Sequence, residues 1–219
     1  MPFNAVDTSQ SDKNYLQSAL DIRSSVLSTY LSEINDIQFT APGWIGRTPQ
    51  EVIKNWRFCN LISPTGSENS ELFTQLDAVF TTSSLPSHVT VIASYISEVF
   101  PSIEEALCST KQPIEFGFKR YCIPLRSDDK CLLHITEDAG GDADGFTQYS
   151  FDEGSVFDFD NPEKPHKFSS SLATGSSIIW FIDVLENDNT TDETLTSILE
   201  DSWRETSSGA LWKQDPIID

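Results

Sequence analysis

Three side chains that could carry out catalysis or bind a metal lie in the middle of the chain: Cys122, His134 and His166. A thiol beside an imidazole can act as a nucleophile with its general base, or as two ligands of a metal ion. Imidazole titrates near neutral pH, so both histidines are candidates for moving a proton during a reaction. The competing interpretation of Cys122 is a small apolar side chain of the core.

A predicted β-hairpin would bring two of these residues together. Residues 114–136 alternate between apolar and polar, and the Ser and Asp cluster at 127–130 predicts a turn between two antiparallel strands. Cys122 would then lie directly opposite His134, with their Cβ atoms roughly 5 Å apart. His166 is expected in a loop between two later strands.

The elements that must position these residues are mainly helices in the first half of the chain and strands in the second. Apolar residues recur at helical spacing in the first half, and the period falls to two from Ile114 onward. Helices are expected at 13–34, about 70–80 and about 87–99, in short segments beginning at Thr48 and Ser102, and from Thr190. Strands are expected at 55–61, 114–136, 154–160 and 177–184.

This order of elements predicts an α+β fold, with helices packed over one side of a β-sandwich. A chain of 219 residues can bury one core, and no linker or internal repeat divides it. We expect a single domain over 1–219. Within it, 1–112 supplies helical support and the first strands, 113–186 the β core, and 187–219 a C-terminal helix and tail.

The charge of the chain excludes several classes of partner. It carries 34 acidic and 14 basic residues, a formal net charge of −20, which repels nucleic acids and anionic membranes. The sequence lacks an apolar run of about 18 residues and an N-terminal signal peptide. Its four cysteines show no CxxC spacing, so we expect free thiols and a cytoplasmic location.

Over residues 110–190, the order of several motifs resembles the aspartyl/asparaginyl β-hydroxylase family. The shared motifs are the strand Arg120–Leu125, a hairpin, Gly-x-x-x-x-Phe-Asp at 154–160, His166, and Ile-Ile-Trp-Phe-Ile-Asp-Val at 178–184. The resemblance implies a double-stranded β-helix, a cupin-like jelly roll, with flanking helices. It also implies a dioxygenase scaffold that uses Fe(II) and 2-oxoglutarate.

Several positions depart from the pattern of that family. Cys122 stands where the first iron-binding histidine would be, whereas His166 matches the second. Ser177 occupies the place of the arginine that pairs with 2-oxoglutarate, and His134 is the nearest equivalent of another basic cofactor contact. A single histidine is a poor ligand set for non-haem iron, and a hydroxyl cannot replace the two-pronged bond of an arginine.

We therefore expect a small-molecule enzyme that acts without the standard iron and 2-oxoglutarate chemistry, by isomerisation or cyclisation of an apolar metabolite. His166 and His134 are the expected proton-handling groups, and Cys122 is the third candidate catalytic residue. No metal ligand and no cofactor-binding residue is assigned. One alternative is an Fe(II)/2-oxoglutarate hydroxylase whose atypical metal site includes Cys122. Another is a non-catalytic binding protein that kept only the fold.

Overall fold

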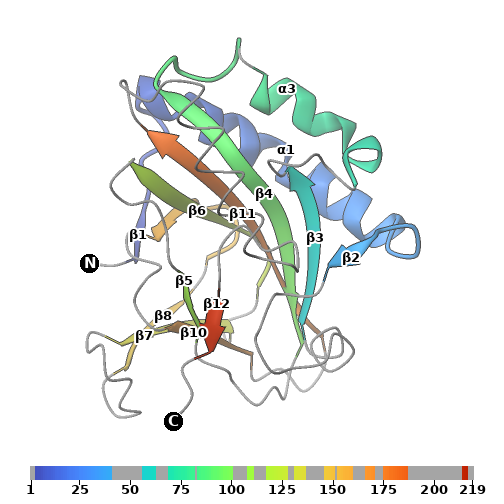
Figure 1. Cartoon of the computed structure of the whole chain (residues 1–219), viewed down its shortest axis with the longest axis vertical. Helices are drawn as coiled ribbons and strands as arrows, with labels where there is room; N and C mark the ends of the chain where they lie inside the picture. The colour runs from blue at the N-terminus through green and yellow to red at the C-terminus, as the bar shows by residue number, and fades with distance from the viewer. Residues whose placement is uncertain are drawn as a thin grey trace.

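The structure is a computed structural model that describes residues 3–40, 56–62, 69–81, 83–100, 108–110, 117–127, 131–136, 146–150, 152–159, 166–170, 175–186 and 214–216. These residues form two antiparallel β-sheets, with helices over the larger one (Figure 1). The helical segments are η1 (Ser11–Lys13), α1 (Asn14–Ser32), η2 (Ser70–Leu72), η3 (Thr74–Leu76) and α3 (Asp77–Phe80).

The two sheets differ in size and in the length of their strands (Figure 1). The larger sheet has seven strands in the order β1 (Phe3–Ala5), β9 (Phe157–Phe159), β6 (Phe118–Arg126), β11 (Ser177–Glu186), β4 (Val89–Val99), β3 (Trp56–Ile62) and β2 (Phe39–Thr40). The smaller sheet has five, in the order β12 (Gln214–Pro216), β5 (Cys108–Thr110), β10 (His166–Ser170), β7 (Cys131–Thr136) and β8 (Phe146–Ser150).

One face of the larger sheet, here the helix face, packs against α1. The apolar positions of α1 recur at helical spacing, and the helix buries Leu16, Ala19, Val26 and Tyr30. These residues share an apolar cluster with side chains of the central strands, among them Ile96, Tyr121 and Trp180. The helix predicted over 13–34 is confirmed as α1. Its apolar stripe packs against the larger sheet, which stabilises the helix.

The opposite face of the larger sheet, here the inner face, packs against the smaller sheet. Its apolar cluster is made of Phe58, Val99, Cys122, Phe157, Phe159, Ile179 and Phe181, together with Ile135 of β7. Strand β11 lies at the centre and is buried on both faces from Ser177 to Leu185. This burial explains its nearly continuous apolar sequence, which is typical of a central strand.

The helix predicted over 87–99 is wrong, because these residues form β4. Their apolar residues at helical spacing also fit a strand with buried residues on both faces, as the burial pattern of β4 shows. Spacing alone cannot separate the two structures when both faces of a strand are apolar. The helix predicted over 70–80 is reduced to two 3-10 turns and the four residues of α3.

The hairpin predicted over 114–136 is also wrong, although strands form within it. Residues 118–126 form β6 in the larger sheet, and 131–136 form β7 in the smaller one. Strand β6 pairs with β11 on one side and β9 on the other, so neither of its edges is open to β7. Alternation indicates that a segment is a strand but does not name its partner.

The helices expected from Thr48, Ser102 and Thr190 lie outside the described residues. In the ranges given above, no helix combines the length and the apolar character that crossing a membrane requires.

Candidate functional site

The inner face is the candidate site, because it holds both Cys122 and Ser177. Cys122 pairs with Phe181 of β11, and Ser177 lies four residues earlier on the same strand and hence on the same face. Ser177 in turn pairs with Val99, a member of the inner apolar cluster. The register of β6, β11 and β4 thus brings to one face of the sheet the two positions that the resemblance matches to cofactor-binding residues.

Cys122 lies in an apolar environment. Its thiol has no exposed surface and packs among Phe157, Ile179 and Phe181. Burial raises the pKa of the Cys122 thiol well above its ordinary value, and the nearby Arg120 guanidinium offsets only part of this rise. The thiol therefore stays protonated at neutral pH, and these surroundings favour the interpretation as a core side chain over that as a nucleophile.

His134 and His166 lie on adjacent strands of the smaller sheet, and the structure places them by strand and register. His134 pairs with Lys167 and His166 with Ile135, so the two residues are one step apart in the β7–β10 ladder. His166 begins β10 rather than lying in a loop. The predicted opposition of Cys122 and His134 is wrong, because Cys122 belongs to the other sheet. The catalytic role of the three residues stays a prediction.

Ser177 holds a buried hydroxyl that makes no hydrogen bond to the described residues. The residue has no exposed surface, and its Oγ makes no hydrogen bond within the part of the chain that the structure describes. Buried polar groups in proteins are nearly always paired, and an unpaired one lowers stability. The resemblance places a carboxylate-binding arginine at this position, and this chain has the neutral hydroxyl of Ser177 there instead.

Ser177→Ala is expected to raise the free energy of unfolding by about 1 kcal/mol, because it removes an unpaired buried hydroxyl. Ser94→Ala is the matched control, since the buried Ser94 Oγ accepts a 2.7 Å hydrogen bond from Trp180 Nε1. That control should lose about 1–3 kcal/mol. Urea denaturation measures both variants, and an equal loss in the two would mean that Ser177 has a partner.

A buried ion pair on the inner face was missed by sequence reasoning. Arg120 of β6 and Asp183 of β11 are directly opposite, and they are 3% and 0% exposed. Arg120 Nε and Nη2 donate to the two carboxylate oxygens of Asp183 at 2.8 and 2.7 Å. The signal that could have revealed the pair was Asp183, a charged residue within the nearly continuous apolar run of β11, which requires a buried cation as its partner.

Two aromatic rings complete the surroundings of this ion pair. Tyr95 and Phe181 stack at 5.0 Å, and the Arg120 guanidinium lies 5.7 and 5.8 Å from their centroids. Burial acts to lower the pKa of Arg120, but the adjacent Asp183 carboxylate raises it above its ordinary value overall. The guanidinium is therefore permanently charged and engaged by Asp183 with two bonds.

The described side chains, which do not include those of His134 and His166, supply no ligand set of the kind that the resemblance implies for Fe(II) and 2-oxoglutarate. Among them, no group of three or more His, Cys, Asp and Glu residues is arranged to hold a metal ion. Cys122 is fully buried among apolar side chains, and binding a metal there would require its deprotonation in those surroundings. The arginine that would bind the 2-oxoglutarate carboxylate with two hydrogen bonds is replaced by the uncharged Ser177. Arg120 already donates from two of its nitrogen atoms to Asp183.

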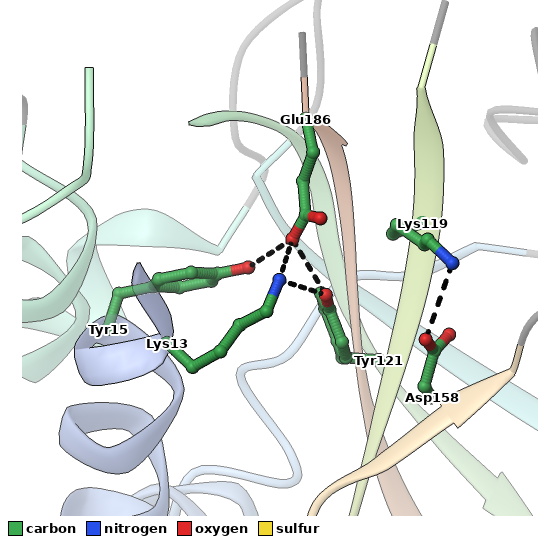
Figure 2. A network of polar contacts seen from close by, with 6 residues as sticks. All are labelled: Lys13, Tyr15, Lys119, Tyr121, Asp158 and Glu186. Carbon is green, nitrogen blue, oxygen red and sulfur yellow. Dashed lines mark hydrogen bonds and ion pairs between the residues drawn. The ribbon is translucent and has the colours of Figure 1, made fainter. Parts of the chain in front are cut away.

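A second polar network lies on the helix face, where it joins α1 to the sheet (Figure 2). Lys13 Nζ contacts the Glu186 carboxylate and donates to the Tyr121 hydroxyl at 2.9 Å. The hydroxyls of Tyr121 and Tyr15 donate to the same Glu186 oxygen at 2.7 and 3.3 Å. This network joins the start of the helix to β6 and to the end of β11.

The Glu186 network predicts an acid-sensitive contribution to stability. Burial acts to raise the pKa of Glu186, but Lys13 and Tyr121 outweigh it and hold that pKa below the ordinary value of 4.5. A lowered pKa contributes stability that is complete above about pH 4.5 and is lost as the pH falls through the folded-state value. We expect the difference in melting temperature between wild type and Glu186→Gln to shrink over that acidic range. A difference that is constant with pH would contradict this assignment.

Comparison with solved structures identifies the type of fold. HygX from Streptomyces hygroscopicus, crystallised with nickel, 2-oxoglutarate and hygromycin B, matches with a TM-score of 0.50 and 9% identity. The match covers 87% of this chain and 85% of HygX. A 2OG-Fe(II) oxygenase-family oxidoreductase from Burkholderia pseudomallei matches with a TM-score of 0.44 and 6% identity, over 62% of this chain and 71% of that one.

These similarities concern the fold alone. No protein-family model matches the chain, and no curated protein sequence matches it significantly. The antiparallel sheets with α1 and α3 match the fold of cupin-like oxygenases. The expectation of a cupin-like dioxygenase fold is confirmed at this level.

Proposed function

We propose that the chain is a small-molecule enzyme on an aspartyl/asparaginyl hydroxylase-like double-stranded β-helix, and that it acts without Fe(II) and 2-oxoglutarate. The observation that carries this proposal is the chemistry of the inner face. Where the resemblance places an iron ligand and a cosubstrate arginine, the sheet has the protonated thiol of Cys122 and the hydroxyl of Ser177. Arg120, a cation on that face, is bound by Asp183.

The inner face favours an apolar metabolite as the substrate. Its side chains are mostly aromatic or aliphatic and form a buried cluster with Ile135 of the smaller sheet. A substrate site between the two sheets would therefore select an apolar molecule by shape. HygX, which has a similar fold, was crystallised with the small molecules 2-oxoglutarate and hygromycin B. That precedent supports binding of a small molecule on this scaffold.

His166 is the proposed proton-handling group of the inner face. It pairs directly with Ile135 of the inner apolar cluster, so the two positions share a face of the smaller sheet. His134 is one register step away, and its position belongs to the opposite face of that sheet. An isomerisation or cyclisation removes a proton at one atom of the substrate and returns one at another. One imidazole can act as both base and acid, so His166 can perform both transfers without a metal.

The experiment is conversion of a mixture of apolar metabolites by the purified chain, under anaerobic conditions and with a metal chelator. We expect mass spectrometry to detect a product of unchanged mass and altered retention time. A product heavier by one oxygen atom, formed only with iron, oxygen and 2-oxoglutarate, would establish the hydroxylase alternative instead. A metabolite that stays bound and unaltered would indicate a binding protein.

A further inference from the structure

Four neighbouring strands of the larger sheet place two arginines and a glutamate in one row. Arg57 of β3 pairs with Glu98 of β4. Ile178 of β11 pairs with Glu98 on one side and with Arg126 of β6 on the other. Three strand spacings separate the backbones of the two arginines by about 14 Å, yet both side chains reach the Glu98 carboxylate.

Both oxygens of the buried Glu98 carboxylate already have partners. The Tyr30 hydroxyl donates to Oε2 at 2.8 Å, and the Ser176 hydroxyl donates to Oε1. Arg57 Nη1 lies 3.8 Å from Oε2, and Arg126 Nη2 lies 3.6 Å from Oε1. The carboxylate thus holds the two guanidinium groups on either side of it through ion pairs, while its hydrogen bonds come from the two hydroxyls.

The two guanidinium groups keep donors that no described residue uses. Their side chains are 33% exposed for Arg57 and 40% exposed for Arg126. The Arg57 guanidinium lies 5.3 Å from the Phe39 ring and 4.9 Å from the Phe100 ring, and it makes no side-chain hydrogen bond to the described residues. Arg126 donates from Nε and Nη2 to Ser176, which leaves Nη1 for a ligand.

The simplest alternative is that the two arginines only neutralise Glu98. One guanidinium would suffice for that charge, and the second leaves the cluster with a local charge of about +1 by counting the three side chains. The whole chain carries a formal charge of −20, so a half-exposed positive cluster is unusual on it. Rings on Arg57 also fix the plane of its guanidinium, which prepares its N–H groups for a planar or tetrahedral anion.

We infer that Arg57 and Arg126 form a binding site for a small oxyanion, the carboxylate or phosphate group of a small ligand. Both kinds of anion offer paired oxygens to the N–H fork of an arginine. Glu98 positions the two cations, and the aromatic rings of Phe39 and Phe100 hold Arg57. The site lies on the helix face and is separate from the inner face and its proposed chemistry.

The test is an NMR titration of the ¹⁵N-labelled full chain with inorganic phosphate and, separately, with acetate, at constant ionic strength. We expect the Nε–H signals of Arg57 and Arg126 to shift with saturation for at least one of the two anions. The anion that saturates identifies the chemical class. Shifts that stay linear for both anions would overturn the site.

Variants connect that binding to the named residues. Arg57→Gln and Arg126→Gln should each lower the affinity for the anion that saturates by about tenfold, which corresponds to the loss of one charge-assisted hydrogen bond. Arg23→Gln is the matched control, because Arg23 bonds the Leu20 carbonyl on α1 and carries the same charge. If Arg57→Gln does not fold, Arg57→Lys replaces it, because lysine keeps a cation beside Glu98. We expect Arg57→Lys to bind the anion more weakly than the wild type does. Equal weakening by Arg23→Gln would show a general charge effect and overturn the assignment.

Discussion

Arg120→Met is expected to lower the free energy of unfolding by about 3–5 kcal/mol, the usual cost of removing one partner of a buried ion pair. The Asp183 carboxylate would remain buried without the two hydrogen bonds that it now accepts from the guanidinium. The rings of Tyr95 and Phe181, over which the Arg120 guanidinium now lies, carry no positive charge that could replace it. Urea denaturation followed by circular dichroism measures the loss.

Two controls separate this cost from lost packing. The double variant Arg120→Met with Asp183→Leu removes both charges and should recover most of the stability, as replacements of buried pairs by apolar residues often do. Lys119→Met breaks the half-exposed Lys119–Asp158 pair (3.5 Å), which lies beside the Glu186 network in Figure 2, and should cost less than about 1 kcal/mol. If the double variant is as unstable as Arg120→Met alone, the loss of stability comes from lost packing and not from the unpaired carboxylate.

His166→Ala is expected to reduce turnover by about 10²–10⁴-fold, the range for loss of a general acid or base. Cys122→Ala should change turnover only a few-fold, because its protonated thiol is a packing group in the inner cluster. The measurement is the initial rate on the metabolite that the anaerobic assay identifies, as a function of pH. Loss of a general acid or base should also change the shape of the pH–rate profile.

Both variants must first give the circular dichroism spectrum of the wild type. Full activity in both would move the catalytic site away from these residues. Loss of activity only in Cys122→Ala would restore the thiol as the reacting group.

The sequence was most informative where an element interacts with a single surface. The stripe of α1 covers one face of a sheet, so its helical period is visible in the residues themselves. Strand β4 is buried on both faces, and its sequence therefore carries no clear period of two. The long apolar run of β11 identified the central strand, because two-sided burial there coincides with a continuous β-branched and aromatic sequence.

Partners distant in the chain could not be predicted from local pattern. Strand β6 is followed in sequence by β7, but its neighbours in space are β9 and β11. The Arg120–Asp183 pair joins residues 63 positions apart, and only the register of β6 with β11 brings them together. The same limit applies to the candidate site, since the sheet to which each of the three candidate residues belongs is set by pairing.

The central claim is that this scaffold works without iron and 2-oxoglutarate, and it is tested by iron content together with succinate release. The full chain would be purified, incubated anaerobically with Fe(II), freed of unbound metal and examined by elemental analysis. It would then be assayed for succinate with 2-oxoglutarate, oxygen and the metabolite mixture, beside an active 2-oxoglutarate oxygenase as control. We predict iron well below one equivalent per chain and no succinate above background. One equivalent of iron with substrate-dependent succinate would contradict the proposal.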